Sequence, residues 1–427
     1  MAGSIQALAH PRQRATRQEG EALLIDLADA GLGTSGGKAA VLARLLAAGL
    51  PVPPGFVVPT AAYEEAAAGL DFSGAGAVRD LPGPSPALTG EIARALTRIT
   101  GDGPVAVRSS ATGEDTATAT AAGQHDTFLG VNGPGEVADA VRGCWASLWS
   151  ERAVAYRRRR PDAGAPVIAV LVQRLVDADV SGVMFTGAVA GAGNGLRLEA
   201  SWGLGESVVG GRVTPDSWTV SGSTVSRRTP GTKRTRIDRG RTGVVTREVA
   251  LADRARYCLT DEEVTRLAEF GRRTAGLLGG EQDIEWAIAG SRIWLLQARP
   301  VTRALPAEAA ASAGAPGRSG GRTGTPGSPG SATGPVRVVR GPGDFGRVRS
   351  GDVLVCRTTD PAWTPLFGLA AGVVTETGGL LSHAAIVARE LGLPAVLAVT
   401  DATAALPDGA VVEVDGDSGR VALLGPG

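Results

Sequence analysis

The most informative stretch of this chain lies near its C-terminal end and runs from Thr375 to Gly392. It reads Thr-Glu-Thr-Gly-Gly-Leu-Leu-Ser-His-Ala-Ala-Ile-Val-Ala-Arg-Glu-Leu-Gly. Ser382 is of a type favoured at helix N-caps, the apolar spacing after it is helical, and Gly392 followed by Pro394 ends the pattern. The stretch therefore predicts a helix whose first turn carries His383.

A histidine at a helix start is suited to phosphoryl chemistry. The N–H groups and the positive dipole end of the helix stabilise an attached phosphoryl group. The loop adds hydroxyl donors and pliable glycines, namely Thr375, Thr377, Gly378, Gly379 and Ser382. The chain has only three histidines, so this placement is hard to assign to chance. We interpret His383 as a residue that becomes phosphorylated; a structural helix-start histidine is the alternative.

Length and composition exclude several classes of protein. The 427 residues exceed what a single core of about 250 residues accommodates. The 43 basic and 43 acidic side chains argue against a whole-surface binder of nucleic acid or anionic membrane. Three separated cysteines, without a CxxC pair, suggest neither a disulfide framework nor a zinc site. With no apolar run long enough for a membrane span, we expect a cytoplasmic protein without nucleic-acid or membrane partners.

Composition also divides the chain. Residues 303–334 are dominated by Ala, Gly, Ser, Pro and Thr, which bury too little apolar surface to offset the ordering entropy. We predict a flexible linker there, with a span of about 30 Å. It separates a body of alternating helical and strand patterns, residues 21–302, from a compact β/α domain, residues 335–427. Residues 1–20 are predicted to be a disordered tail.

A predicted hairpin in the body carries three polar residues. Asp283-Ile-Glu-Trp-Ala-Ile and Arg292-Ile-Trp-Leu-Leu-Gln-Ala-Arg alternate with period two around a turn. Antiparallel pairing about Gly290 would put Glu285 on the same face as Gln297 and Arg299. Carboxylate and amide oxygens suit Mg²⁺, and a guanidinium binds phosphate. A purely structural hairpin does not need three such residues aligned.

Two further segments of the body point to phosphate binding. Gly36-Gly37-Lys38 precedes a helix, and a lysine beside a glycine-rich turn is a phosphate-binding arrangement. The tripeptide is a weak signal alone, but Lys38 is one of only two lysines in the chain. Arg108 ends a short strand and is followed by a Ser-Ser-Ala-Thr-Gly-Glu-Asp loop that could cover a nucleotide.

Together these segments resemble the family of phosphoenolpyruvate synthase, pyruvate phosphate dikinase and rifampicin phosphotransferase, over nearly the whole chain except the tail and the linker. The resemblance implies an α+β or α/β fold, with an ATP-grasp body and a small swivelling β/β/α phosphohistidine domain. It implies that His383 is phosphorylated and that Glu285 and Gln297 hold Mg²⁺. The resemblance implies that ATP is bound by Lys38, Arg108, Gly113, Gln173, Leu175, Glu199 and Arg299. Three of these, Lys38, Arg108 and Arg299, are also implied to be catalytic.

The resemblance implies a dikinase reaction. ATP would give its β-phosphoryl group to His383, releasing AMP and phosphate, with the γ-phosphoryl passing to water or inorganic phosphate. The sequence shows neither the family's pyruvate-binding barrel nor its helical acceptor domain. Three hypotheses follow. The acceptor is a small molecule with a hydroxyl or amine, such as a natural product or antibiotic, or the chain is the carrier half of a split enzyme whose partner protein supplies the acceptor site. The third, a non-catalytic nucleotide-binding protein, is the weakest because every motif residue is present.

Overall fold

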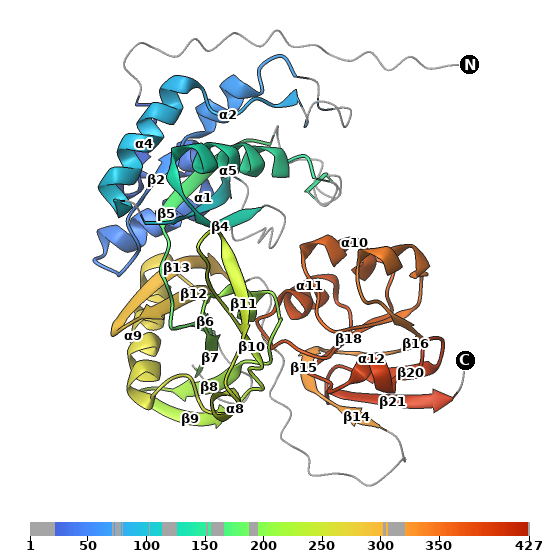
Figure 1. Ribbon diagram of the computed structural model, residues 1–427. Helices are drawn as coiled ribbons and strands as arrows, with labels where there is room; N and C mark the ends of the chain where they lie inside the picture. Colours follow the sequence, from blue (N-terminus) through green and yellow to red (C-terminus); the bar gives the residue numbers. More distant parts are fainter. Residues whose placement is uncertain are drawn as a thin grey trace, which may run out of the picture.

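The computed structural model describes residues 22–425, apart from 71, 73–77, 79, 102, 113–125, 151–152, 155–165, 188–194, 302–304 and 306–320. Figure 1 shows three parts: an N-terminal lobe (blue to green), a second lobe (yellow-green to gold) and a C-terminal domain (orange to red) beside the second lobe. The predicted N-terminal tail lies outside the described residues. Within the described part, no helix has the length and apolarity to cross a membrane.

The N-terminal lobe is an antiparallel sheet covered by helices. Its strands lie in the order β1 (Ile25–Asp26), β2 (Gly55–Val58), β5 (Ile168–Arg174), β3 (Val105–Ala111) and β4 (Thr127–Val131). The helical elements are η1 (Leu27–Asp29), α1 (Leu32–Ala47), α2 (Thr60–Ala66), α4 (Pro86–Thr100) and α5 (Gly133–Ser147). Ser85 caps α4 by accepting the N–H of Leu88, with Pro86 at the first helical position. Apolar side chains of α4, α5, β3 and β5 form one core around the buried Trp145.

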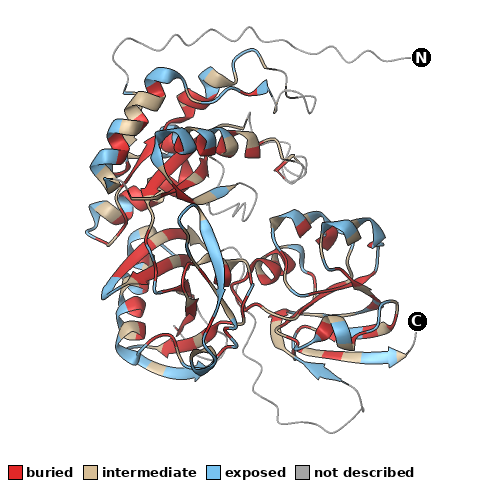
Figure 2. Cartoon of the chain, viewed as in Figure 1, coloured by how far each residue is buried: buried red, intermediate tan, exposed pale blue. Residues whose placement is uncertain are grey.

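The second lobe is built on a six-stranded antiparallel sheet. Its order is β13 (Arg292–Pro300), β12 (Gln282–Ala289), β6 (Val180–Phe185), β7 (Gly195–Trp202), β8 (Asp216–Ser221) and β9 (Thr224–Thr229). Helix α9 (Asp261–Leu278) covers one face and begins with a reciprocal cap between Thr260 and Glu263. Its apolar side packs with Trp218 and Trp286 in a core shared with α1. Figure 2 shows the buried residues concentrated along these sheets.

Smaller elements complete this lobe. They are α7 (Glu206–Val209), α8 (Leu251–Arg254) and the two-stranded ribbon of β10 (Thr235–Arg239) and β11 (Val244–Glu248). The ribbon is anchored where Leu204 N–H donates to the Ile237 carbonyl at 2.7 Å, and Gly243 N–H donates to Gly130 of the first lobe at 3.2 Å. It therefore connects the two lobes of the body, which agree with the ATP-grasp architecture implied by the resemblance.

The predicted hairpin is confirmed. β12 and β13 pair antiparallel around a turn at Gly290, whose φ of 59° is the left-handed conformation that glycine adopts easily. Glu285 pairs with Gln297, and Asp283 pairs with Arg299. Because side chains two residues apart on a strand share a face, Gln297 and Arg299 point to the same side as Glu285.

The C-terminal domain is an eight-stranded mixed sheet with short helices. Its order is β14 (Arg322–Thr323), β21 (Arg420–Gly425), β20 (Val411–Asp415), β16 (Ser331–Val338), β17 (Val353–Cys356), β18 (Gly372–Thr375), β19 (Ala395–Leu397) and β15 (Thr325–Ser328). Its helices are η2 (Pro342–Arg347), η3 (Pro361–Trp363), α10 (Thr364–Phe367), α11 (His383–Leu391) and α12 (Ala402–Ala405). One apolar cluster packs beneath α10 and α11 and a second, valine-rich cluster lies on the other side. The predicted α+β architecture is confirmed.

The linker prediction is wrong at its C-terminal end. Residues 322–334, assigned to the linker from composition, form β14, β15 and part of β16. Their glycines mark close backbone approaches rather than flexibility: a Cβ at Gly324 would lie 2.2 Å from the Leu397 carbonyl oxygen, and one at Gly334 would lie 2.3 Å from that of Gly351. Small residues are needed there because neighbouring strands leave no room for side chains. Most of the remaining predicted linker lies outside the described residues.

Candidate functional site

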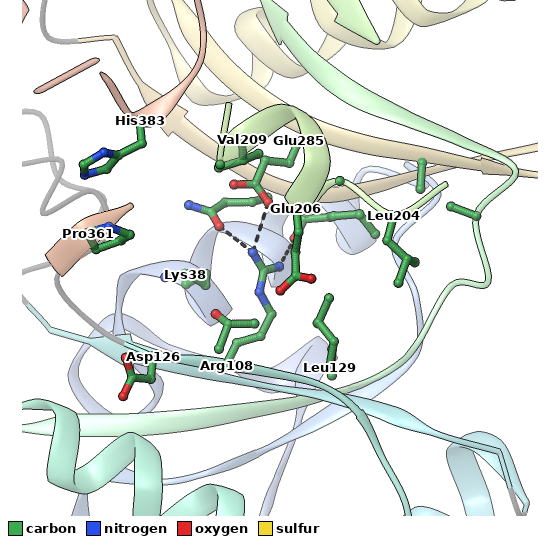
Figure 3. A pocket seen from close by; sticks show the side chains of 18 of the residues that line it. Lys38, Arg108, Asp126, Leu129, Leu204, Glu206, Val209, Glu285, Pro361 and His383 are labelled. Atoms are coloured by element: carbon green, nitrogen blue, oxygen red, sulfur yellow. Dashed lines mark hydrogen bonds and ion pairs between the residues drawn. The ribbon is translucent and has the colours of Figure 1, made fainter. Parts of the chain in front are cut away.

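One cavity of about 700 Å³ lies where the two lobes of the body meet the C-terminal domain. This volume is in the range of small-molecule sites. Figure 3 shows His383 on one side of Arg108, with Leu204 on the other. The predicted site residues that line the cavity are Lys38, Arg108, Gln173, Leu175, Glu285, Gln297, Arg299 and His383.

Lys38 reaches the cavity because α1 is kinked. Gly36 inside this helix has φ 76° and ψ 170°, and a Cβ there would lie 1.9 Å from the backbone oxygen of Ser110 on β3. The Ser110 hydroxyl donates to the Ser35 carbonyl at 2.8 Å and accepts the Ala39 N–H at 3.2 Å. The predicted glycine-rich turn is thus a close helix–strand contact that leaves Lys38 buried at the cavity wall.

Arg108 joins the two lobes of the body. From β3 it donates through Nη2 to the Gln297 side-chain oxygen at 2.6 Å and to the Glu285 carboxylate at 3.2 Å. Its Nη1 donates to the Leu296 carbonyl at 2.6 Å. Figure 3 shows these bonds as dashed lines meeting at the guanidinium. The two oxygens predicted to bind a metal are therefore close together, and here both face one cation.

The second predicted phosphate-binding arginine is also paired. Arg299 donates through Nε and Nη2 to one carboxylate oxygen of Asp283, at 2.9 and 2.7 Å. Both side chains are largely buried. The sequence prediction did not assign Asp283, although the hairpin register places it directly opposite Arg299. The signal that could have identified Asp283 is its position two residues before Glu285, which puts both side chains on the same face of the strand.

His383 is the first residue of α11, as predicted, with Ser382 at the N-cap position and Gly392 in a left-handed C-cap. The imidazole is buried. Its Nδ1 is hydrogen-bonded to the Thr359 hydroxyl at 2.9 Å, and the Phe367 ring meets it edge-on at 6.1 Å between centroids. Sequence reasoning missed both partners because they come from a loop and a helix that the fold alone brings to His383.

The predicted loop hydroxyls of Thr375, Thr377 and Ser382 do not line the cavity in this structure, and their role toward a phosphoryl group stays a prediction. Ser382 donates to the Gly379 carbonyl at 2.8 Å instead of capping α11 through its side chain. Thr375 donates to the Thr377 carbonyl at 2.7 Å, and Thr377 donates to the Gly211 carbonyl of the body at 2.6 Å. Backbone carbonyls are the nearest acceptors in this turn, so these side chains shape and dock the loop.

Glu199 also has a different contact from the one predicted. Its carboxylate is buried and accepts the N–H groups of Leu380 at 2.9 Å and Leu381 at 3.1 Å. A Cβ at Gly379 would lie 2.2 Å from a carboxylate oxygen, so glycine is required for the loop to approach. Glu199 does not line the cavity in this arrangement. It holds the loop before His383 against the body, and its contact with a nucleotide stays a prediction.

A buried cation lies near the same contact. Burial lowers the pKa of Arg389 on α11 to about 10, while the charges of Glu199 and Asp283 act in the opposite direction. Arg389 donates to the Gly327 carbonyl at 2.9 Å. The Thr358 hydroxyl also contacts the body, within hydrogen-bond distance of the Gly210 and Gly211 carbonyls. The Gly378 N–H donates to the Val213 carbonyl of the body. The C-terminal domain thus rests on the body with His383 facing the cavity.

Two residues predicted to bind ATP, Gln173 and Leu175, lie at the wall of the cavity. Gln173 is buried and donates to the Pro53 carbonyl at 3.1 Å. The Leu175 N–H donates to the Pro104 carbonyl at 3.0 Å. Leu175 therefore contributes apolar surface here, and its N–H serves the packing of the lobe. Gly113, predicted to contact ATP, lies outside the described residues.

Glu206, at the start of α7, is a cavity residue that sequence reasoning did not assign. Burial raises the pKa of its carboxyl, while the charge of Arg212 acts in the opposite direction. Figure 3 shows it beside Arg108, on the side toward Leu204 and Leu129. A carboxylate in a partly apolar pocket is unusual enough to mark a binding group, but no sequence pattern distinguished it.

Comparison with known proteins agrees with this geometry. Residues 84–315 match the profile of the pyruvate phosphate dikinase AMP/ATP-binding domain. The chain belongs to this family. Residues 348–419 match the mobile domain of PEP-utilising enzymes. The dikinase-type ATP-binding domain and the mobile domain thus correspond to the body and the C-terminal domain.

Individual relatives of this dikinase-family chain are long proteins. A probable phosphoenolpyruvate synthase of Methanothermobacter thermautotrophicus is 38% identical over 91% of this chain and 61% of its own length. Another from Archaeoglobus fulgidus is 35% identical over 90% of this chain and 56% of its length. The prodigiosin synthesizing transferase PigC of Serratia marcescens is 43% identical over 62% of this chain and 31% of its length. This chain therefore spans 56–61% of the length of these two synthases.

The residues of the dikinase-family site fit a magnesium ion bound together with a nucleotide. Glu285 and Gln297 offer two hard oxygen donors that already meet at one cationic nitrogen. No group of three or more His, Cys, Asp or Glu side chains able to hold a metal occurs in the described part of the chain. Mg²⁺ is commonly held by one or two protein oxygens together with substrate phosphates and water. The pair therefore suits Mg²⁺ bound with ATP better than a permanent metal.

Proposed function

We propose that this protein is an ATP-dependent phosphotransferase that works through a phosphohistidine at His383. The observation that carries the proposal is that His383 lines the same cavity as Arg108, Glu285 and Gln297, although it comes from a separate domain. A nucleophile facing a cluster of phosphate-binding and metal-binding groups is the arrangement that phosphoryl transfer requires. The family relationship supports ATP as the donor.

The proposed reaction transfers the β-phosphoryl group of ATP. A nitrogen of His383 attacks the β-phosphorus. The bond between the β-phosphorus and the oxygen of the α-phosphate breaks, and AMP leaves. Water or inorganic phosphate then takes the γ-phosphoryl group, which leaves the β-phosphoryl on the histidine. Lys38, Arg108 and Arg299 would bind the phosphate oxygens and neutralise charge as it moves. Magnesium held by Glu285 and Gln297 would supply further neutralisation at the phosphates.

The hydrogen bond to Thr359 indicates which imidazole nitrogen reacts. Thr359 occupies Nδ1 at 2.9 Å, so we assign the attack to Nε2. If the threonine hydroxyl accepts from Nδ1–H, it holds the neutral tautomer whose Nε2 lone pair is available. The same bond fixes the plane of the ring, as the edge-on contact with Phe367 does.

We also propose that Glu206 binds the ribose of ATP. Figure 3 shows Arg108 with His383 on one side and Glu206, Leu204 and Leu129 toward the other. ATP has the same order, with phosphates first, then ribose, then the apolar adenine. A carboxylate accepts two hydroxyl hydrogen bonds, so ribose hydroxyls would satisfy Glu206 in a pocket where burial disfavours its charge.

The acceptor of the phosphoryl group is proposed by class only. We favour a small molecule with a hydroxyl or amine, since the family includes a relative whose name is that of a biosynthetic transferase, prodigiosin synthesizing transferase PigC. The second candidate is the carrier half of a split phosphoenolpyruvate synthase-like enzyme. It is supported by the names of two relatives that match 91% and 90% of this chain, both probable phosphoenolpyruvate synthases. We propose that the reaction takes place in the cytoplasm, where ATP is available and thiols outside disulfides, such as those of Cys144, Cys258 and Cys356, remain reduced.

The decisive experiment incubates the full chain with Mg²⁺ and ATP labelled at the β-phosphorus. We expect acid-labile label on the protein together with AMP, and no label on His383→Ala. Formation of ADP without AMP would sink the dikinase assignment. Label retained by His383→Ala would move the phosphorylated residue elsewhere.

A further inference from the structure

We propose that Arg108 is a built-in counter-cation that occupies the magnesium ligands until a nucleotide draws it away, so that the metal site opens only when ATP is bound. The inference rests on the proposed metal and phosphate roles of this site and adds an order of binding to them. It follows from which atoms Arg108 contacts in this structure.

One nitrogen of the guanidinium takes both metal-ligand oxygens. Nη2 lies 2.6 Å from the Gln297 oxygen and 3.2 Å from the Glu285 carboxylate oxygen. A magnesium ion would bind the same oxygens at about 2.1 Å. It would then lie within a few ångströms of the guanidinium, and two cations at that separation repel strongly in a poorly hydrated cleft.

The surroundings favour the position of the Arg108 guanidinium against Glu285 and Gln297. The Arg108 side chain is only 11% exposed, so solvent screens its charge poorly. Nη1 is fixed by the Leu296 carbonyl at 2.6 Å, on the same strand as Gln297. The guanidinium thus neutralises Glu285 while it connects β3 of one lobe to the β12–β13 hairpin of the other. Without a competing anion, a metal ion alone gains little by displacing it.

The neighbouring pair shows the same arrangement. Arg299 donates twice to Asp283, on the same face of the hairpin. Both predicted phosphate-binding arginines are therefore neutralised by carboxylates of β12 in this structure. The triphosphate supplies the anion that attracts the guanidinium of Arg108, which releases Glu285 and Gln297 for the metal that arrives with the nucleotide.

The test measures Mn²⁺ binding to the full chain by electron paramagnetic resonance, without turnover. We expect weak binding to the nucleotide-free protein and stoichiometric binding when a non-hydrolysable ATP analogue is present. Arg108→Met keeps the length of the side chain and removes its charge. It should bind Mn²⁺ without nucleotide at least about tenfold more tightly than the wild type, within the usual range of coupling between sites.

Two further variants make the result specific. Arg174→Met removes a charge from the same cavity, but the Arg174 guanidinium lies over the Trp294 ring at 5.1 Å, so it should leave Mn²⁺ affinity nearly unchanged. Arg108→Met combined with Glu285→Gln should lose the gained affinity. Mn²⁺ should also raise the unfolding temperature of Arg108→Met more than that of the wild type, which shows that the variant is folded.

Two outcomes would overturn the inference. One is tight Mn²⁺ binding by the nucleotide-free wild type, and the other is an Arg108→Met variant that binds Mn²⁺ no better than wild type. An equal gain in Arg174→Met would attribute the effect to general charge. None of these measurements depends on phosphorylation of His383, so a failed phosphotransfer assay and a failed metal assay remain distinguishable.

Discussion

The two ends of the cavity are held together by different kinds of contact. At the nucleotide end, Arg108, Glu285 and Gln297 stand on strands of two sheets, and charged hydrogen bonds join them directly. At the other end, His383 enters from a separate domain that rests on the body through hydrogen bonds of hydroxyl and backbone N–H groups, two of them donated to the Glu199 carboxylate. One end belongs to the folded body itself, whereas the other depends on how a domain is docked.

This difference matches the chemistry proposed for each end. Groups that bind phosphates and metal gain from fixed geometry, which strands of a packed sheet provide. A phosphoryl carrier must leave the donor site after transfer. A few interdomain hydrogen bonds, each worth about 1–3 kcal/mol, are enough to favour the docked position and few enough to break in each cycle. The bonds through Glu199 and Thr377 are of this kind.

The largest expected effect is at the end of the cavity formed by Arg108, Glu285 and Gln297. Glu285→Gln removes the charged ligand while keeping its shape, and AMP formation should fall by about a hundredfold or more because charge neutralisation at the phosphates is lost. Docking should be unaffected, as shown by unchanged hydrogen exchange at the amides of Leu380 and Leu381. Glu262→Gln, on the exposed side of α9, is the matched control. Loss of protection at those amides in Glu285→Gln would show that the two ends are not independent.

The second effect is on the docked end. Glu199→Gln replaces one acceptor oxygen with an N–H₂ group that faces a backbone N–H, so the loop before His383 loses a charge-assisted bond and gains a repulsive contact. Phosphohistidine formation should fall by about tenfold, while the Kd for ATP stays the same. The amides of Leu380 and Leu381 should exchange faster. Weaker ATP binding with unchanged exchange would instead restore the nucleotide contact first predicted for Glu199.

The two ends of the cavity also differ in how much of their structure could be predicted from the sequence. The hairpin could be predicted because period-two alternation and a glycine turn are local signals, and they brought Glu285 and Gln297 together correctly. Helix α11 was predicted for the same reason, from its N-cap position and Gly392. Both rest on interactions between residues close in sequence.

The docked contacts could not be predicted from local patterns. Thr359 is 24 residues from His383, and Leu380 is 181 residues from Glu199, so only the tertiary arrangement reveals these bonds. The glycines of β15 and β16 were misread because a small residue needed for close packing looks, in composition, like one needed for flexibility. Glu206 gave no signal in the sequence, since the cavity that it lines is formed by residues of both lobes.

A third, smaller effect tests how His383 is oriented. Thr359→Val removes the hydrogen bond to Nδ1 with almost no change in volume, and the rate of phosphohistidine formation should fall by about fivefold, the equivalent of one neutral hydrogen bond. Thr359→Ser should retain most of the rate. ATP affinity and the exchange of the loop amides should not change. A Thr359→Val rate equal to that of the wild type would show that the Phe367 contact alone is enough to hold the ring.

The smallest effect concerns Glu206, which lies beside Arg108 on the side away from His383. Burial raises the pKa of Glu206 in the folded protein, with Arg212 opposing, so the folded state holds this proton to higher pH than the unfolded chain. Stability is therefore lost as pH rises from the ordinary carboxyl pKa through the raised one. Glu206→Gln removes this penalty and should increase the free energy of unfolding slightly at neutral pH. Urea unfolding should show that the gain shrinks below about pH 4, where the carboxyl is protonated in both states. A gain of the same size at both pH values would mean that packing, rather than charge, is what the substitution changed.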